Sequence, residues 1–211
     1  MIGDKLLLKD VHYDKKDYIL PFIQSKYKFN KLTIALGGQS GVGKTEIASL
    51  IQADLWDIGT IRCKVIHIDD YYKTMWQNRN WIRRREGLQS IGSVEIDWDT
   101  LNDIINTFHS GAKRITTQRI HKYTNSIEFC ETSNHCIDIL LVEGLYANHL
   151  KNKDYGIYLC GGIKETTEFR IERQKEILDD FRESVLVVER EDILKTKPLA
   201  DLIVPFSLGD K

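Results

Sequence analysis

Residues 36–47 read LGGQSGVGKTEI, and Gly38–Thr45 within them fits the pattern G-x-x-x-x-G-K-[ST]. Glycine permits the backbone to fold closely around phosphate oxygens with its N–H groups turned inward. An apolar run, 31–36, ends just before the glycines, and a helical pattern starts just after Thr45. The positive end of that helix dipole would face the same phosphates. The motif in this setting predicts a nucleotide-binding loop, whose residues are Gly38, Gln39, Ser40, Gly41, Val42, Gly43, Lys44 and Thr45.

The last two residues of this loop carry the expected chemistry. Lys44 would reach the β- and γ-phosphates of a nucleoside triphosphate and act in catalysis there, and the Thr45 hydroxyl would ligate Mg²⁺. The alternative is a chance match in a glycine-rich turn, which average residue usage gives about one time in a hundred for a chain of this length. The flanking apolar run and helical pattern favour the nucleotide site.

Further apolar runs alternate with helical patterns along the chain. Runs of this kind suit strands that are buried on both faces, as in a parallel sheet. Helical patterns follow Thr45 and Asp97, and another covers 164–184. The alternation predicts an α/β P-loop NTPase fold with a mostly parallel, doubly wound sheet flanked by helices, in one domain over 1–211 with a core at about 32–205. The further runs are 63–68, 137–142, 156–160 and 201–204.

Composition restricts the class of protein. The chain has 211 residues with 30 basic and 31 acidic side chains, a balance that argues against a nucleic-acid-binding surface. It has no apolar run of about 18 residues, which a membrane span needs, and its start has no apolar run of signal-peptide length. We therefore expect a cytoplasmic protein with a small-molecule acceptor and no nucleic-acid or membrane partner. A homo-oligomer is left open.

Acidic residues end two of the apolar runs. Asp69 and Asp70 follow the run in HIDDYYKT (67–74), and Glu143 follows the run in LLVEGLY (140–146). The carboxyl ends of strands in an open α/β sheet carry the ligand site, so these acids are expected near the loop. One carboxylate would help to hold Mg²⁺, and another would accept the proton of an attacking hydroxyl. The alternative for each acid is a turn or helix-cap residue.

The order of these motifs resembles the uridine kinase and phosphoribulokinase family of P-loop small-molecule kinases. The resemblance is carried by GGQSGVGKT, IDDYYK, LLVEGLYA and KTKPLADLIV and runs from about residue 32 to 205. It implies transfer of a phosphate from ATP, with Mg²⁺, to an alcohol of a small metabolite. It further implies Asp69 as catalytic base, Tyr72 as a substrate contact, and a metal site at Thr45, Glu143 and Asp69. The charged helix with Arg170 and Arg173 would correspond to the family's lid.

The sequence departs from the nucleoside kinases of this family in the acceptor region. It has SIGSVEIDWD where they have a D-H-P element, and TTQRIHKYTNSIEF where they have P-x-Y-D. Arg119, His121 and Tyr123 are the residues that would replace the latter, with Tyr123 as a substrate contact. Uridine or cytidine is the first candidate acceptor, and a sugar phosphate or another small alcohol is the alternative. A nucleotide-binding regulatory protein is the alternative from another class, although the chain lacks an N-K-x-D motif for guanine.

The stretch WIRRREGLQSIG (81–92) contains three consecutive arginines. A charge run of this kind is either a solvated helix face or an anion site for a phosphorylated acceptor, in which case Arg84 would bind the substrate. The aromatic residues that precede the arginines either line a substrate pocket or fill the core; they are Tyr71, Tyr72, Trp76 and Trp81. His67 and His121 are expected to be packing residues rather than catalytic ones.

Overall fold

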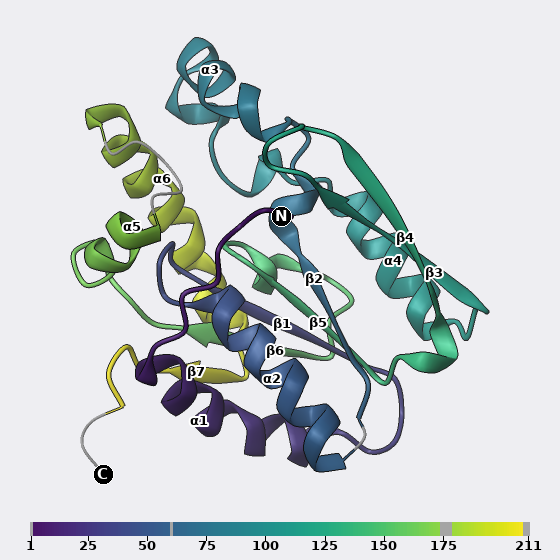
Figure 1. The fold of residues 1–211 in the computed structure, drawn as a ribbon. Helices are drawn as coiled ribbons and strands as arrows, with labels where there is room; N and C mark the ends of the chain where they lie inside the picture. Colours follow the sequence, from purple (N-terminus) through teal and green to yellow (C-terminus); the bar gives the residue numbers. More distant parts are fainter. Residues whose placement is uncertain (1, 60, 174–178, 209–211) are drawn as a thin grey trace.

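A parallel sheet lies at the centre of the fold, with strand order β2-β5-β1-β6-β7 (Figure 1). The structure is a computed structural model that describes residues 2–59, 61–173 and 179–208. Every strand pair in the sheet is parallel, and each apolar run predicted as a strand contributes one strand. The strands are β1 (Leu32–Gly38), β2 (Cys63–His67), β5 (Ile139–Gly144), β6 (Tyr155–Leu159) and β7 (Leu202–Val204).

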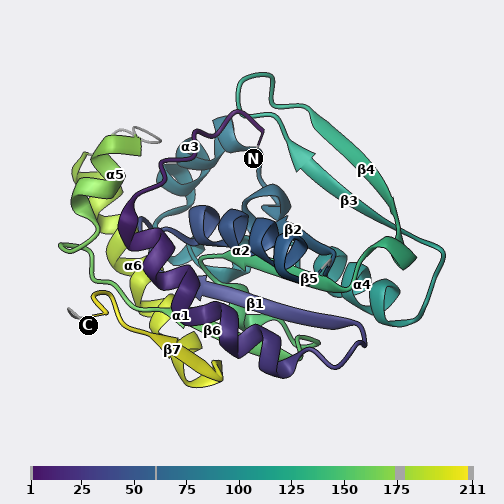
Figure 2. The ribbon, with the colours of Figure 1, turned by 60° about the horizontal axis from the view of Figure 1, so that its bottom comes forward.

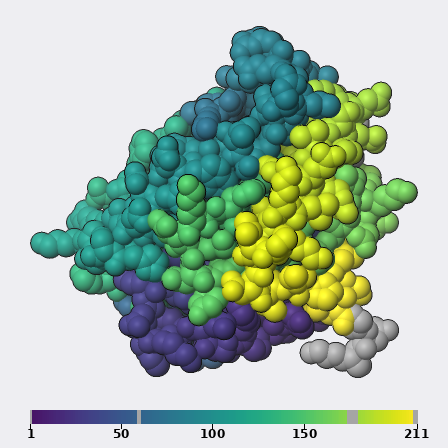
Figure 3. All heavy atoms as spheres, turned by 180° about the vertical axis from the view of Figure 1, so that it is seen from behind, coloured from purple at the N-terminus to yellow at the C-terminus, as the bar shows by residue number. Residues whose placement is uncertain are grey.

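Helices cover both faces of this sheet. On one face, α1 (Asp10–Lys26) and α2 (Lys44–Gly59) pack side by side against one apolar cluster, and α1 also contacts β7 (Figure 2). On the other face, α4 (Trp98–His109) and α6 (Asp180–Thr196) cover a second cluster (Figure 3). The short 3₁₀ turn η5 (Ala147–His149) packs against the same face. The three layers confirm the predicted α/β P-loop NTPase fold with its doubly wound parallel sheet.

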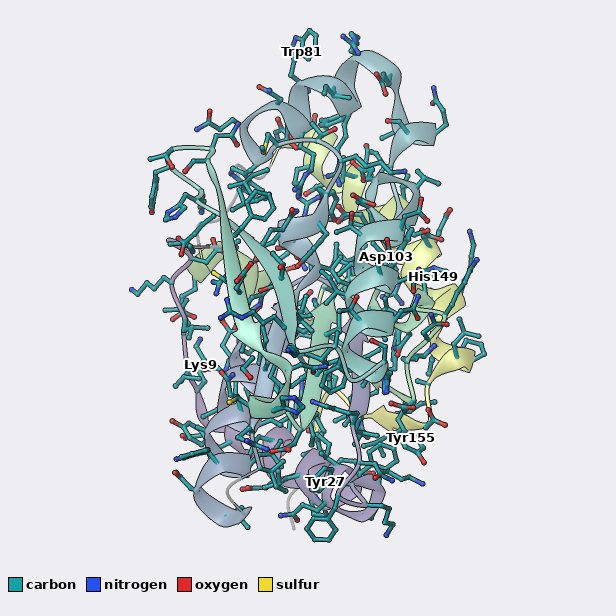
Figure 4. The ribbon with its side chains drawn as sticks, turned by 90° about the vertical axis from the view of Figure 1, so that its right-hand side faces the viewer. Lys9, Tyr27, Trp81, Asp103, His149 and Tyr155 are labelled. Atoms are coloured by element: carbon teal, nitrogen blue, oxygen red, sulfur yellow. The ribbon has the colours of Figure 1, made fainter. Side chains whose placement is uncertain are left out.

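Two elements lie outside the parallel sheet and its covering helices. Helix α3 (Trp76–Glu86) follows β2 after the 3₁₀ turn η1 (Ile68–Tyr71), and Trp81 projects from its outer surface (Figure 4). A hairpin of β3 (Arg114–Ile120) and β4 (Ile127–Ser133) forms a separate two-stranded sheet. Neither strand of the hairpin was expected from the sequence.

The helical pattern over 164–184 does not form one helix. Helix α5 (Thr167–Arg173) and helix α6 are separate, because Asp179 has an extended backbone and its side chain accepts a hydrogen bond from Arg182 N as the cap of a new helix. Ile177 and Leu178, which belong to this pattern, lie outside the described residues. Within the described part of the chain, no helix is both long and apolar enough to cross a membrane.

Candidate active site

The glycine-rich loop joins the end of β1 to the start of α2. Gly41 and Gly43 adopt left-handed backbone conformations, with φ of 83° and 89°, which side-chain-bearing residues rarely adopt. A Cβ on Gly43 would lie 2.5 Å from the His12 ring, and one on Gly41 would lie 3.0 Å from Thr166 O. Lys44 folds back over the loop, where its Nζ donates to Gln39 O at 2.9 Å. The backbone is thus closed tightly into the cradle that phosphate binding requires.

Glu143 stands where three strands end. The parallel register places it beside Leu36 of β1 and His67 of β2. Its Oε1 accepts a hydrogen bond from the Thr45 hydroxyl at 3.0 Å and lies 2.6 Å from His67 Nδ1. Burial acts to raise the pKa of Glu143, but the hydrogen bond and charge of His67 and the charge of Lys44 outweigh burial and hold that pKa below its ordinary value. Glu143 is therefore kept as a carboxylate beside the loop.

The two adjacent aspartates after β2 point to different places. Asp69 lines a cleft together with Lys44 and Thr45. Asp70 is fully buried, where it accepts a hydrogen bond from Ile120 N at 2.9 Å and lies 3.2 Å from Arg119 Nε. Burial raises the pKa of Asp70, against the opposing effects of the Ile120 N–H and the Arg119 charge. Asp69 thus lines the cleft beside the glycine-rich loop, whereas Asp70 fastens the hairpin to η1.

The cleft extends from the loop to helices α3 and α6. Tyr72 and Trp76 form part of its wall, and Arg79 of α3 stacks on Tyr72 with its guanidinium carbon 3.4 Å from the ring centroid. Two of the four aromatic residues before the arginine run thus reach the cleft. Tyr71 is buried in the core and Trp81 is exposed.

A network of ion pairs joins α3 to α6 at the same cleft. Arg83 donates two hydrogen bonds of 2.8 Å to Glu95, at the end of η3 (Ser93–Glu95), and lies 3.2 Å from Glu189. Arg182 donates to both carboxylate oxygens of Glu189 at 3.1 and 3.2 Å. Buried pairs of this kind fix geometry because either charge alone would be costly to bury. The network therefore fixes the position of α3 relative to α6.

The predicted lid arginines belong to α5. Arg170 lines the cleft, its Cγ would lie 3.0 Å from a Cβ on Gly41, and its Nη2 donates to Ile163 O at 2.9 Å. Burial lowers the pKa of Arg170, an effect that the charge of Arg182 reinforces. The structure thus brings Arg170 to the glycine-rich loop. The side chain of Arg173 lies outside the described residues.

Two predicted substrate contacts are not among the cleft residues that the structure describes. Arg84 points to α6, where it pairs with Asp179 at 2.6 Å and lies over Phe181. Tyr123 is 77% exposed in the turn between β3 and β4. Of the predicted substrate contacts, Tyr72 lines the cleft, whereas Arg84 and Tyr123 are not among its lining residues.

Four residues that line the cleft or contact Glu143 beside it were missed in the sequence. Arg79, Arg182 and Glu189 lie on helices whose orientation only the tertiary structure shows, and His67 was expected to be a packing residue. His67 could have been identified, because it is the last residue of β2 and therefore neighbours the acid that ends β5. Parallel strands bring their carboxyl ends to one edge.

The donor set fits Mg²⁺ held jointly with a nucleotide. No group of three or more His, Cys, Asp or Glu side chains in the described ranges is arranged as a metal cage. Mg²⁺ commonly uses one or two protein oxygens together with substrate phosphates. The Thr45 hydroxyl and the ionised Glu143, in direct contact beside the loop, are oxygen donors of this type.

A family model and a curated relative both match most of this chain. The family model described as "Phosphoribulokinase / Uridine kinase family" matches residues 33–173. The bifunctional alpha-galactosidase/sucrose kinase AgaSK of Mediterraneibacter gnavus is 29% identical over 188 residues, which cover 83% of this chain and 20% of that protein. The chain thus spans about a fifth of the length of this relative.

Two solved structures show the same fold. A possible uridine kinase from Bacillus stearothermophilus matches with a TM-score of 0.63 and 17% identity, over 91% of this chain and 98% of that one. Phosphoribulokinase from Rhodobacter spheroides matches with a TM-score of 0.61 and 12% identity, over 84% of this chain and 70% of that one. At these identities the likeness concerns the fold alone.

Proposed function

Because the chain belongs to the phosphoribulokinase and uridine kinase family, we propose that it moves the γ-phosphate of ATP to an alcohol group of a small metabolite in a Mg²⁺-dependent reaction. One observation carries the proposal. The glycine-rich loop with Lys44 and Thr45, the buried carboxylate Glu143 and the acid Asp69 all line one cleft that continues to an aromatic and arginine-rich end. We place the protein in the cytoplasm in this proposal because the reaction needs a supply of ATP.

Each residue has a defined role in this reaction. Thr45, Glu143 and Asp69 are the groups that would hold Mg²⁺, which when bound neutralises charge on the β- and γ-phosphates. Asp69 accepts the proton of the acceptor hydroxyl while the acceptor oxygen bonds to the γ-phosphorus. The bond from that phosphorus to the bridging oxygen breaks, and ADP leaves. Lys44 and Arg170, which both lie at the loop, stabilise the charge on the transferred group.

Two classes of acceptor remain within the proposal. Uridine or cytidine follows from the resemblance of IDDYYK to uridine kinases. A sugar or sugar phosphate is favoured by the arginines at the far end of the cleft, by the position of Tyr123 outside it, and by the sucrose kinase activity in the name of the relative. An ATP-binding regulatory protein is disfavoured because Lys44, Thr45 and Asp69 are all present at the cleft.

The test is a product screen with ATP and Mg²⁺ over nucleosides, neutral sugars, sugar phosphates and small hydroxy acids. We expect ADP and a phosphorylated acceptor in equal amounts with one class. In Lys44→Ala, turnover should fall by at least roughly 10²–10³-fold because a cation at the transferred phosphate is lost. ATP binding without any phosphorylated product would favour the regulatory alternative. Undiminished turnover in Lys44→Ala would contradict the assignment of the loop.

A further inference from the structure

Arg79 is a buried cation with two donor atoms that have no hydrogen-bond partner among the residues that the structure describes. The residue is 5% exposed, and these two atoms, Nε and Nη2, are both buried. An arginine remains charged in proteins, and a buried donor that has lost water without gaining a partner is unfavourable. Arg79 also lines the cleft. Its unpaired donors therefore call for a ligand in that cleft.

The neighbouring arginines Arg83 and Arg182, in contrast, are paired with carboxylates. Arg83, one turn further along α3, is paired with Glu95 and Glu189, and Arg182 is paired with Glu189. The positive charges of these two arginines are therefore balanced by the negative charges of the two glutamates. Arg79 is thus the residue at this end of the cleft that brings positive charge without a carboxylate among its described contacts.

Stacking fixes the plane of the guanidinium. Its central carbon lies 3.4 Å from the Tyr72 ring centroid and 5.2 Å from that of Trp76. A guanidinium that stacks on a ring keeps its N–H groups in the plane, pointing outward from its edge. That arrangement matches the two oxygens of a carboxylate or phosphate, which an arginine binds with parallel hydrogen bonds.

We propose that Arg79 binds a carboxylate or phosphate group of the acceptor, so that the enzyme selects anionic alcohols over neutral ones. This inference rests on the proposed kinase function. The anion belongs to the acceptor and not to ATP because the nucleotide phosphates have their own cations, Lys44 and Arg170, whose contacts are in the glycine-rich loop and at the start of α5. Arg79 instead contacts Tyr72, the predicted substrate contact, and Trp76.

Matched pairs of probes test this proposal. Fructose 6-phosphate is compared with fructose, and glycerate with glycerol, by calorimetric binding to protein that already holds a non-hydrolysable ATP analogue and Mg²⁺. The charged member of at least one pair should bind at least tenfold more tightly, and the pair that responds shows whether the group is phosphate or carboxylate. In Arg79→Gln this preference should fall by roughly 10- to 150-fold, the value of a hydrogen-bonded charge. Binding of the ATP analogue should stay within about threefold because its phosphates contact other residues.

Two further variants complete the design. Arg79→Lys keeps the charge and loses the planar fork, so it should retain part of the preference. Arg85→Gln is the matched control on the same helix, because Arg85 is exposed and pairs with Glu86. It should bind like the wild type. Wild-type comparisons need no variant, so a folding defect in Arg79→Gln does not block the test.

The outcomes separate this inference from the proposed function. Equal binding of charged and neutral members, no binding of either charged probe, or a preference that survives in Arg79→Gln would overturn the role of Arg79. The proposed function would be untouched as long as the ATP analogue binds and the product screen yields a phosphorylated acceptor. Failure of both ATP binding and product formation would refute the kinase proposal itself.

Discussion

Replacing Arg83 by methionine should lower the free energy of unfolding by about 3–5 kcal/mol, the cost of removing one partner from a buried ion pair. The Arg83 side chain is 3% exposed, and it donates to Glu95 twice at 2.8 Å and lies 3.2 Å from Glu189. Its loss leaves Glu95 as a largely buried carboxylate without that cation, whereas Glu189 keeps Arg182. The lower end of the range is therefore expected.

The assay is urea denaturation followed by tryptophan fluorescence and circular dichroism, with Arg83→Met, Glu95→Gln and the double variant compared as a cycle. A coupling energy of about 1–3 kcal/mol is expected between the two residues. Arg85→Met on the same helix should change stability by no more than about 0.5 kcal/mol because Arg85 is exposed. If Arg83→Met were as mild as Arg85→Met, or the coupling were below about 0.5 kcal/mol, Arg83 would not anchor α3 through its ion pair with Glu95 as described.

Three more outcomes are expected. Glu143→Gln should raise the Mg²⁺ concentration needed for half-maximal turnover by roughly 10- to 100-fold, with partial rescue by added Mg²⁺, and a metal-insensitive loss would contradict its role. Asp70→Ala should lower the free energy of unfolding in urea by about 1–3 kcal/mol because the buried Ile120 N–H loses its acceptor, and an unchanged midpoint would contradict this. Burial raises the pKa of Cys63 to about 12, so a thiolate-directed reagent at about pH 8 should label the exposed Cys136 while Cys63 reacts only after unfolding. Mass spectrometry of the labelled peptides measures this, and rapid labelling of native Cys63 would refute it.

The sheet and the nucleotide loop could be predicted because their signals are local. The central strands β1 and β5 are buried on both faces, so each appears as a continuous apolar run, and the loop needs its glycines within eight consecutive positions from Gly38 to Thr45. Asp69 and Glu143 could be predicted at the ends of strands for the same reason, because each directly follows or ends an apolar run in the sequence. Their catalytic roles stay predictions, as does the domain boundary.

The hairpin and α1 could not be predicted because their stability depends on tertiary contacts. Strand β4 is mostly exposed and its residues are largely polar, so pairing with β3 defines it. Helix α1 buries Lys15 and Lys16 and contains Pro21, which conceals its amphipathic pattern. Charged residues of this kind are normally expected at the surface.

The three consecutive arginines show why the acceptor end could not be assigned from sequence. Successive residues of a helix point about 100° apart, so Arg83, Arg84 and Arg85 cannot share one anion. Arg83 enters the ion-pair network, Arg84 pairs with Asp179 and Arg85 pairs with Glu86. Arg79, whose Nε and Nη2 have no hydrogen-bond partner among the described residues, lies one turn before the run. It is not part of a cluster of charged residues, so the sequence pattern does not single it out.

The most direct test of the account is the single-turnover rate of phosphate transfer by Asp69→Asn, measured with excess enzyme, labelled ATP and the best acceptor from the screen. The substitution keeps the shape of the side chain and removes the base. The account predicts intact ATP binding with transfer slowed by roughly 10²–10⁴-fold, the usual contribution of a general base, at every Mg²⁺ concentration. Asp70→Asn, the adjacent carboxylate that faces the hairpin, should keep a rate within about tenfold of the wild type in its folded fraction. Transfer at the wild-type rate in Asp69→Asn, or an equal loss in both variants, would contradict the assignment of Asp69 as the base of a small-molecule kinase.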